Sequence, residues 1–206
     1  PTCINFTVCW IKMNHKLESY ENNWTDYEMR SILSVICYYN NIINFGFCLT
    51  RASYIGNSEI VEFILGKRTE YVRYDTECDI GLNNACTGGH YKIAEIFFKN
   101  SETHPTHRDF TASIKSGNSK LVELLLKDVH RLHIFEKTYD TQFDPTFNSN
   151  EAFILACKLR VIGVITILLN DNRVDPNDQD CSAIIYACAN GHTDVVKVLL
   201  SCSRVE

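Results

Sequence analysis

The chain carries an internal repeat, because one frame of residues recurs five times along it. The last copy, residues 187–200, reads ACANGHTDVVKVLL, and the first, residues 52–65, reads ASYIGNSEIVEFIL. Each copy starts with a small residue, which we call the anchor, and the anchors are Ala52, Ala85, Ser113, Ala156 and Ala187. Their spacings of 33, 28, 43 and 31 residues indicate a series of short stacked units rather than one undivided core.

Apolar residues keep fixed offsets from the anchor in every copy. In the last copy they are Ile184, three before the anchor, and residues 195–196 and 198–200 after it. Four copies carry Gly four residues after the anchor, and the copy that starts at Ala156 has Arg160 there instead. The pattern predicts two helices per repeat, the first ended by a left-handed residue and the second amphipathic. The predicted N-caps of the second helices are Ser58, Ser119 and Thr193.

Neither helix can bury its apolar stripe alone, so neighbouring repeats must stack. The linkers repeat as well, since Asp144-Pro145 and Asp175-Pro176 each lie twelve residues before an anchor. Asp-Pro favours a turn, and its fixed offset predicts a turn that projects between successive helix pairs. The predicted fold class is therefore an all-α solenoid.

The segment NGHTDVVKVLL, residues 190–200, resembles the second half of the ankyrin repeat, a family whose period is 33. The resemblance extends from Phe45 to the C-terminus and implies an ankyrin-repeat solenoid of stacked helix-turn-helix pairs with projecting turns. The family's Thr-Pro-Leu-His opening is replaced by residues 182–185 and 151–154, which removes a hydrogen-bonded cap and implies less stable repeats.

Composition suggests a source. The chain has 20 Ile and 18 Asn against 9 Gly and 9 Ala, which favours an AT-rich genome. Together with the Asp-Pro turns, this composition resembles that of divergent ankyrin proteins of amoebae or amoeba-infecting giant viruses.

The repeats divide the chain into three parts. Residues 45–206 hold five ankyrin-like repeats, residues 25–44 a degenerate capping repeat, and residues 1–24 an N-terminal segment of unclear structure. An insertion around residues 129–143 explains the long spacing between two anchors. It is a candidate recognition loop, or a loop whose aromatic residues fold back on the preceding repeat; its candidate contact residues are Arg131, Phe135 and Tyr139.

The charge, the apolar runs and the cysteines of the sequence argue against several classes of protein. A formal net charge of −5 argues against a dedicated nucleic-acid binder. The longest strongly apolar run, residues 161–169, is too short to cross a bilayer, so no membrane partner is expected. Ten scattered cysteines are typical of a reduced intracellular protein, and we expect a cytoplasmic location, in the host cell if the protein is viral.

The sequence predicts neither catalysis nor the binding of a metal ion or cofactor. The pairs His104/His107 and His130/His133 lack an accompanying Cys-x2-Cys, so we expect no metal site. No nucleotide-binding or nucleophile motif occurs, so we expect no cofactor, no small-molecule substrate and no catalytic residue. The recurring His90 and His192 are interpreted as helix-cap contacts.

The resemblance to ankyrin repeats implies a non-enzymatic scaffold that binds a protein partner through its concave face. The residues that family geometry places there are Tyr54, Arg73, Tyr74, Asp75, Thr106, His107, Phe147, Asn148, Asn177, Asp178 and Gln179. In an alternative hypothesis, the array is a fragment or targeting arm of a larger multidomain protein, whose activity, such as ubiquitin-ligase recruitment, lies elsewhere. This alternative rests on the start at Pro1 without an initiator Met and on the uncovered last helix, since only six residues follow Leu200.

Overall fold

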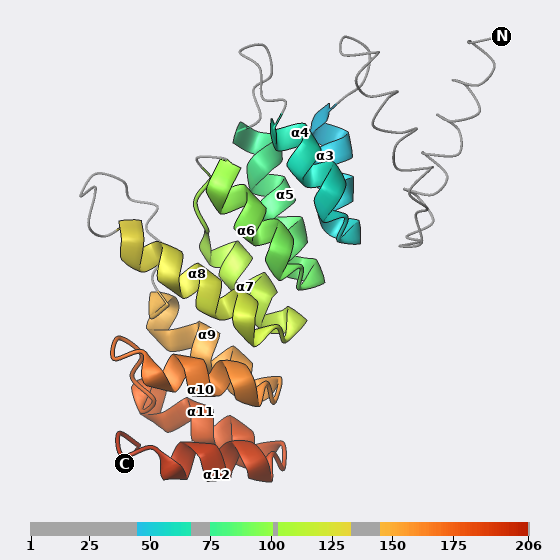
Figure 1. Ribbon diagram of the computed structural model, residues 1–206. Coiled ribbons are helices and arrows are strands. Elements are labelled where there is room, and N and C mark those ends of the chain that lie inside the picture. The colour runs from blue at the N-terminus through green and yellow to red at the C-terminus, as the bar shows by residue number, and fades with distance from the viewer. Residues whose placement is uncertain (1–44, 67–74, 101–102, 133–144, 206) are drawn as a thin grey trace, which may run out of the picture. The chain divides into compact units, whose positions relative to one another are not determined.

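The computed structural model describes residues 45–66, 75–100, 103–132 and 145–205, and every regular element in these ranges is a helix (Figure 1). Two predicted segments, residues 1–24 and 25–44, lie outside them. The described helices are α3 (Phe45–Ile55), α4 (Ser58–Gly66), α5 (Asp75–Gly88), α6 (Tyr91–Asn100), α7 (His107–Ser116), α8 (Ser119–Leu132), α9 (Phe147–Lys158), α10 (Ile162–Asn170), α11 (Asp178–Ala189) and α12 (Thr193–Ser201).

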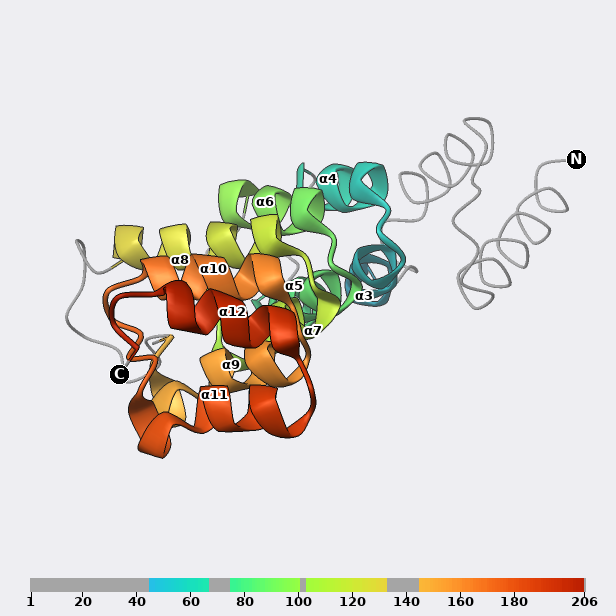
Figure 2. The same cartoon turned by 90° about the horizontal axis from the view of Figure 1, so that it is seen from below.

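The helices form pairs that stack in two layers, separately in each of two compact units. In the unit that ends at Thr103, α3 packs on α5 and α4 on α6. In the unit from His104 onward, α7, α9 and α11 form the inner layer and α8, α10 and α12 the outer layer (Figure 2). The predicted fold class, an all-α solenoid of helix pairs, is confirmed.

The anchors lie in the packed interior of the repeats. All five are at most 1% exposed, so each contributes a minimal side chain to a tightly packed contact. The carbonyl of the anchor also closes the helix end. It accepts the backbone N–H five residues on, as in Asn57 to Ala52 at 2.9 Å and His192 to Ala187 at 2.9 Å. Two backbone hydrogen bonds end a helix in a Schellman turn, and this one spans the larger number of residues.

The residue four after the anchor is left-handed in every repeat. The four glycines there have φ between 68° and 94°, as predicted. Arg160 takes the same conformation with φ 59°, although a side chain disfavours it. The turn is therefore kept in the one repeat that lacks the glycine.

The predicted N-caps were wrong by one residue. Ser58, Ser119 and Thr193 are the first residues of α4, α8 and α12. Asparagine performs the cap in two cases, because Asn57 Oδ1 accepts the N–H of Ile60 at 3.1 Å and Asn118 Oδ1 that of Leu121 at 3.2 Å. Before α12 the cap position is His192, whose side chain makes no capping bond.

The predicted insertion begins inside a helix. α8 has 14 residues, whereas α10 and α12 have 9 each, so the outer helix continues to Leu132 before the chain leaves the described range.

Candidate functional site

Two exposed tyrosines, one on α3 and one on α11, each lie beside a cation. Tyr186 of α11 is 40% exposed, and the Lys158 Nζ of α9 lies 3.9 Å from the centre of its ring. Tyr54 of α3 is 39% exposed, and the Arg51 guanidinium lies 5.9 Å from its ring centre. The four residues occupy only two positions in the repeat. Arg51 and Tyr186 lie one residue before their anchors, and Tyr54 and Lys158 lie two residues after theirs. These positions therefore point away from the stacked core in both units.

In the unit from His104 onward, the first turns of α9 and α11 are joined by side-chain hydrogen bonds. Gln179 Nε2 donates to the carbonyl of Asn148 at 3.3 Å, and Asn150 Nδ2 donates to Asp178 Oδ2 at 2.6 Å. Asp178 Oδ1 also accepts the N–H of Gln179 at 2.7 Å. Three of the residues predicted from family geometry, Asn148, Asp178 and Gln179, are thus brought together.

These turns contain left-handed residues other than glycine. Asn148 and Asn150 have φ of 54° and 57°, and three successive residues at the start of α11, Gln179, Asp180 and Cys181, have φ between 52° and 60°. Asparagine tolerates this region better than most residues, but three left-handed residues in sequence are unfavourable by roughly 1–2 kcal/mol each. The hydrogen bonds between the two turns offset part of this cost.

Asn177 faces away from that cluster. Its Nδ2 donates to the carbonyl of Arg204 at 2.6 Å, and the Arg204 guanidinium donates to the carbonyls of Val174, at 2.7 Å, and Leu169. The predicted recognition residue Asn177 therefore fastens the last linker to the segment after α12.

The remaining predicted residues divide into structural and undescribed ones. Thr106 is the N-cap of α7: its Oγ1 accepts the N–H of Asp109, whose carboxylate accepts the N–H of Thr106 at 2.7 Å, and His107 begins the helix half-buried. The residues whose positions or side chains lie outside the described part of the chain are Arg73, Tyr74, Asp75, Arg131, Phe135, Tyr139 and Phe147.

The recurring histidines connect one repeat to the previous one. His192 Nδ1 lies 3.2 Å from the carbonyl of Cys157, and His90 Nε2 lies 3.0 Å from the carbonyl of Tyr54. A carbonyl only accepts, so the facing ring nitrogen carries the proton. Each histidine thus caps the end of the first helix of the preceding repeat, whereas the sequence predicted a cap contact within its own repeat.

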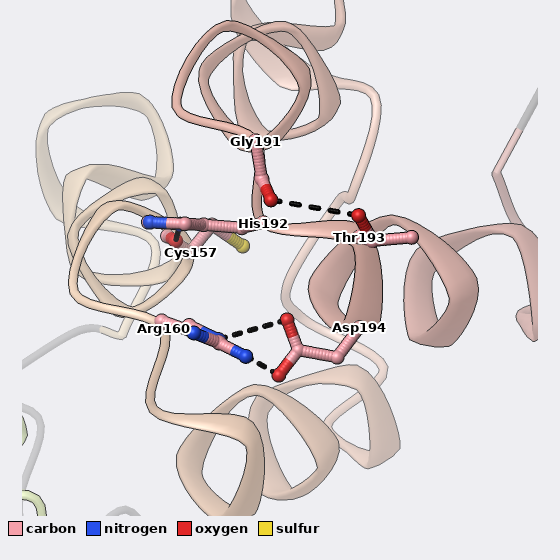
Figure 3. A network of polar contacts seen from close by, with 6 residues as sticks. All are labelled: Cys157, Arg160, Gly191, His192, Thr193 and Asp194. Carbon is pink, nitrogen blue, oxygen red and sulfur yellow. Dashed lines mark hydrogen bonds and ion pairs between the residues drawn. The ribbon is translucent and has the colours of Figure 1, made fainter.

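A second bridge accompanies His192. Figure 3 shows the Arg160 guanidinium facing the Asp194 carboxylate, with Nε 2.9 Å from each oxygen. Arg160 holds the left-handed position after α9, and Asp194 lies in the first turn of α12. The hydrogen bond from Arg160 lowers the pKa of Asp194 below its ordinary value of 3.8.

Two thiols are strongly perturbed by burial. Desolvation raises the pKa of Cys48 to about 11 and that of Cys157 to about 12. Such thiols stay protonated at neutral pH and act as small apolar groups, which makes them poor nucleophiles and poor metal ligands. Within the described ranges, no group of three or more His, Cys, Asp and Glu side chains could hold a metal ion.

Sequence reasoning missed Lys158, Tyr186 and the Arg160–Asp194 pair. A signal for Lys158 was present, because it lies two residues after its anchor, as the predicted residue Tyr54 does. Arg160 stood out only as a missing glycine. Its partner, Asp194, is 34 residues away, and only the stacking of the repeats brings the two together.

Comparison with known proteins supports this architecture. The family model for ankyrin repeats (3 copies) matches residues 110–206, which hold the last three anchors. A search of curated proteins finds no match to the chain. In the described part of the chain, no helix combines the length and apolarity that a membrane crossing requires. Residues 110–206 thus carry ankyrin repeats in sequence, and the fold of the described part of the chain is the all-α ankyrin-repeat solenoid.

Proposed function

We propose that the protein is a non-enzymatic interaction module that binds a protein partner through its inner helices and the turns before them. The observation that carries the proposal is the Lys158–Tyr186 pair. Tyrosine is among the residues that contribute most to protein interfaces, since a large amphipathic ring is buried on binding with little loss of side-chain entropy. Tyr186 is exposed and lies outside the packed core, so the fold does not require it.

The charges around this pair specify the kind of partner. Lys115 and Lys158 are exposed on successive inner helices, whereas Glu151, Asp175 and Asp180 are exposed on or beside the turns. The surface is therefore cationic along the helices and acidic along the turns. A partner segment with acidic or aromatic residues toward the helices and basic residues toward the turns complements it.

We further propose a cytoplasmic location. The buried thiols Cys48 and Cys157 support a reducing compartment, because both lie in the apolar core where a free thiol suits the packing. An origin in amoebae or their giant viruses stays a hypothesis that rests on composition and on the divergent repeat openings.

Binding measurements on matched variants test the interaction. The tagged full chain is used to capture partners from a lysate, and the affinity of each captured protein is then measured with purified components. Tyr186→Ala is expected to weaken binding by about tenfold or more, which is the usual effect of truncating an interface hot spot. Lys197→Ala, an equally simple change on the outer helix α12, is the control and is expected to leave the affinity unchanged.

The two variants also define the opposite result. If circular dichroism shows that Tyr186→Ala is folded and the captured partner binds it as tightly as the parent chain, the inner-helix surface is not the binding site. Equal losses for both variants would show that the effect is not specific to the inner-helix surface, which also contradicts the proposal.

A second candidate role is the targeting arm of a larger protein. One observation favours it, namely the exposed apolar side chains on the last helix pair, Ile185 at 56% and Leu200 at 66% exposure.

A further inference from the structure

The last helix pair exposes a set of apolar residues that has a buried counterpart in the preceding pair. Four residues of α11 and α12 form what we call the terminal face: Ile185, Cys188, Val196 and Leu200. Ile185 and Leu200 are 56% and 66% exposed, Cys188 is exposed and Val196 is half-buried. This arrangement is unusual for three aliphatic side chains and a thiol.

The same four positions of α9 and α10 carry almost the same residues: Ile154, Cys157, Ile165 and Leu169. Only one position differs, where Val196 replaces Ile165. In that pair Ile154 is 6% exposed, Cys157 and Ile165 are 0% exposed, and Leu169 is half-buried. α11 packs on α9 and α12 on α10, so a following helix pair covers these residues. The terminal face is thus chemically a stacking face.

The turn after α12 reproduces the turn after α10. Asp171 and Cys202 end the two helices with φ/ψ of −85°/115° and −81°/123°. Val174 then donates to the carbonyl of Asp171 at 3.1 Å, and Val205 donates to that of Cys202 at 3.1 Å. The equivalent residues are 31 apart, which is also the spacing of the last two anchors. After α10 this turn leads through Pro176 into a helix pair.

The apolar terminal face and the turn after α12 lie at the same end of the same unit, and both match the place where one helix pair is followed by another. We propose that the terminal face is covered by a further ankyrin-type helix pair, which the turn at residues 202–205 introduces. The occupant resembles α11 and α12 themselves, since that pair already covers an almost identical face. Val205, half-buried here, then takes the fully buried place of Val174.

A tandem extension tests the proposal. A copy of residues 176–206 is appended directly after Glu206, so that Glu206 takes the place of Asp175 and the 31-residue spacing is kept. The readout is the rate at which a thiol reagent labels Cys188 in the folded chain, followed by mass spectrometry of its peptide. We expect labelling to slow by about tenfold or more in the extended chain, because the thiol reacts only when the appended pair opens.

Leu200→Lys provides the matched variant in both chains. In the parent chain the side chain is exposed, so the midpoint of urea unfolding is expected to stay the same. In the extended chain the same change places a charge under the appended pair and is expected to restore fast labelling of Cys188. An extension of identical composition in scrambled order is expected to leave Cys188 as reactive as in the parent chain.

Three results would overturn the proposal. Cys188 could react equally fast in both chains, or the appended residues could add no helical signal in circular dichroism. Alternatively, sedimentation of the parent chain could reveal a dimer that protects Cys188 and that Leu200→Lys dissociates, in which case a second copy occupies the terminal face. All measurements use purified protein without a binding partner, so they do not depend on the proposed function.

Discussion

At the scale of single residues, helix packing depends on positions that lack a side chain. A Cβ on Gly81 of α5 would lie 2.6 Å from Cζ of Phe97 and 3.2 Å from Oγ of Ser53. Both neighbours are completely buried, so neither has free space to move into. The role of Gly81 could not be predicted from the sequence, because it depends on α3 and α6. The role of Gly191 could be predicted, since the left-handed turn is a property of its own backbone.

Gly81→Ala is expected to lower the free energy of unfolding. Alanine gains about 1 kcal/mol in helix propensity, but overpacking a closed core costs about 1–3 kcal/mol. We therefore expect a net loss of up to about 2 kcal/mol, measured by urea unfolding.

Gly66→Ala is the control for this prediction. Nothing lies within 4 Å of a Cβ built at Gly66, so this variant is expected to be neutral or slightly more stable. If Gly81→Ala is as stable as Gly66→Ala, the close approach of α3, α5 and α6 does not exist in solution.

At the scale of helices and turns, the sequence predicted the pairs well and the contacts between pairs poorly. Helix periods and the glycine position are local features, and the predicted pairing of helices is confirmed. The Arg160–Asp194 pair and the bonds of Asn150 and Arg204 join residues 27 to 35 apart along the chain. They depend on how one repeat sits on the next, so no local pattern predicts them.

The Arg160–Asp194 pair makes part of the stability sensitive to acid. The pKa of Asp194 is lower in the folded chain than in the unfolded one, chiefly because Arg160 donates to it. The stabilisation is therefore present above pH 4 or so and is lost as the pH falls through the folded pKa. Arg160→Gln is expected to remove this difference, so the unfolding curves of the two chains should converge in acid.

A further variant separates the contribution of the ion pair to stability from the cost of the left-handed backbone at residue 160. Arg160→Gly also removes the pair, but it relieves the left-handed conformation by about 1 kcal/mol. We expect it to be more stable than Arg160→Gln at every pH. If the two variants are equally stable, the turn after α9 is not left-handed in solution.

At the scale of the whole molecule, the two units share one kind of core but differ in how well their sequences reveal it. The family model matches residues 110–206 only, although α3 to α6 form the same helix pairs with the same buried anchors. The repeat frame alone sufficed to predict these pairs. The exposed residues of the inner helices were harder to predict, since exposure depends on the neighbours on both sides of a repeat.

Alkaline pH is expected to destabilise both units. The pKa is raised to about 11 at Cys48 and about 12 at Cys157 in the folded chain, so the unfolded thiols lose their protons first, from about pH 9. The free energy of unfolding therefore falls as the pH rises above 9, by about 1 kcal/mol per thiol at pH 10.

Cys157→Ala separates this effect from other titrations at high pH. The variant is expected to lose stability less steeply between pH 9 and 10.5 than the parent chain in urea unfolding. Cys188→Ala removes an exposed thiol and should keep the parent slope. Identical slopes in all three chains would show that Cys157 is not desolvated.

The histidine caps have a consequence for synthesis on the ribosome. The carbonyl of Tyr54 accepts a hydrogen bond from the imidazole of His90, 36 residues later. The carbonyl of Cys157 accepts one from the imidazole of His192, 35 residues later. Each inner helix is therefore completed only after the following repeat has emerged from the exit tunnel. A nascent chain that pauses within one repeat leaves the end of its newest helix exposed to water. In these two repeats the cap hydrogen bond therefore forms only after the next repeat has been synthesised.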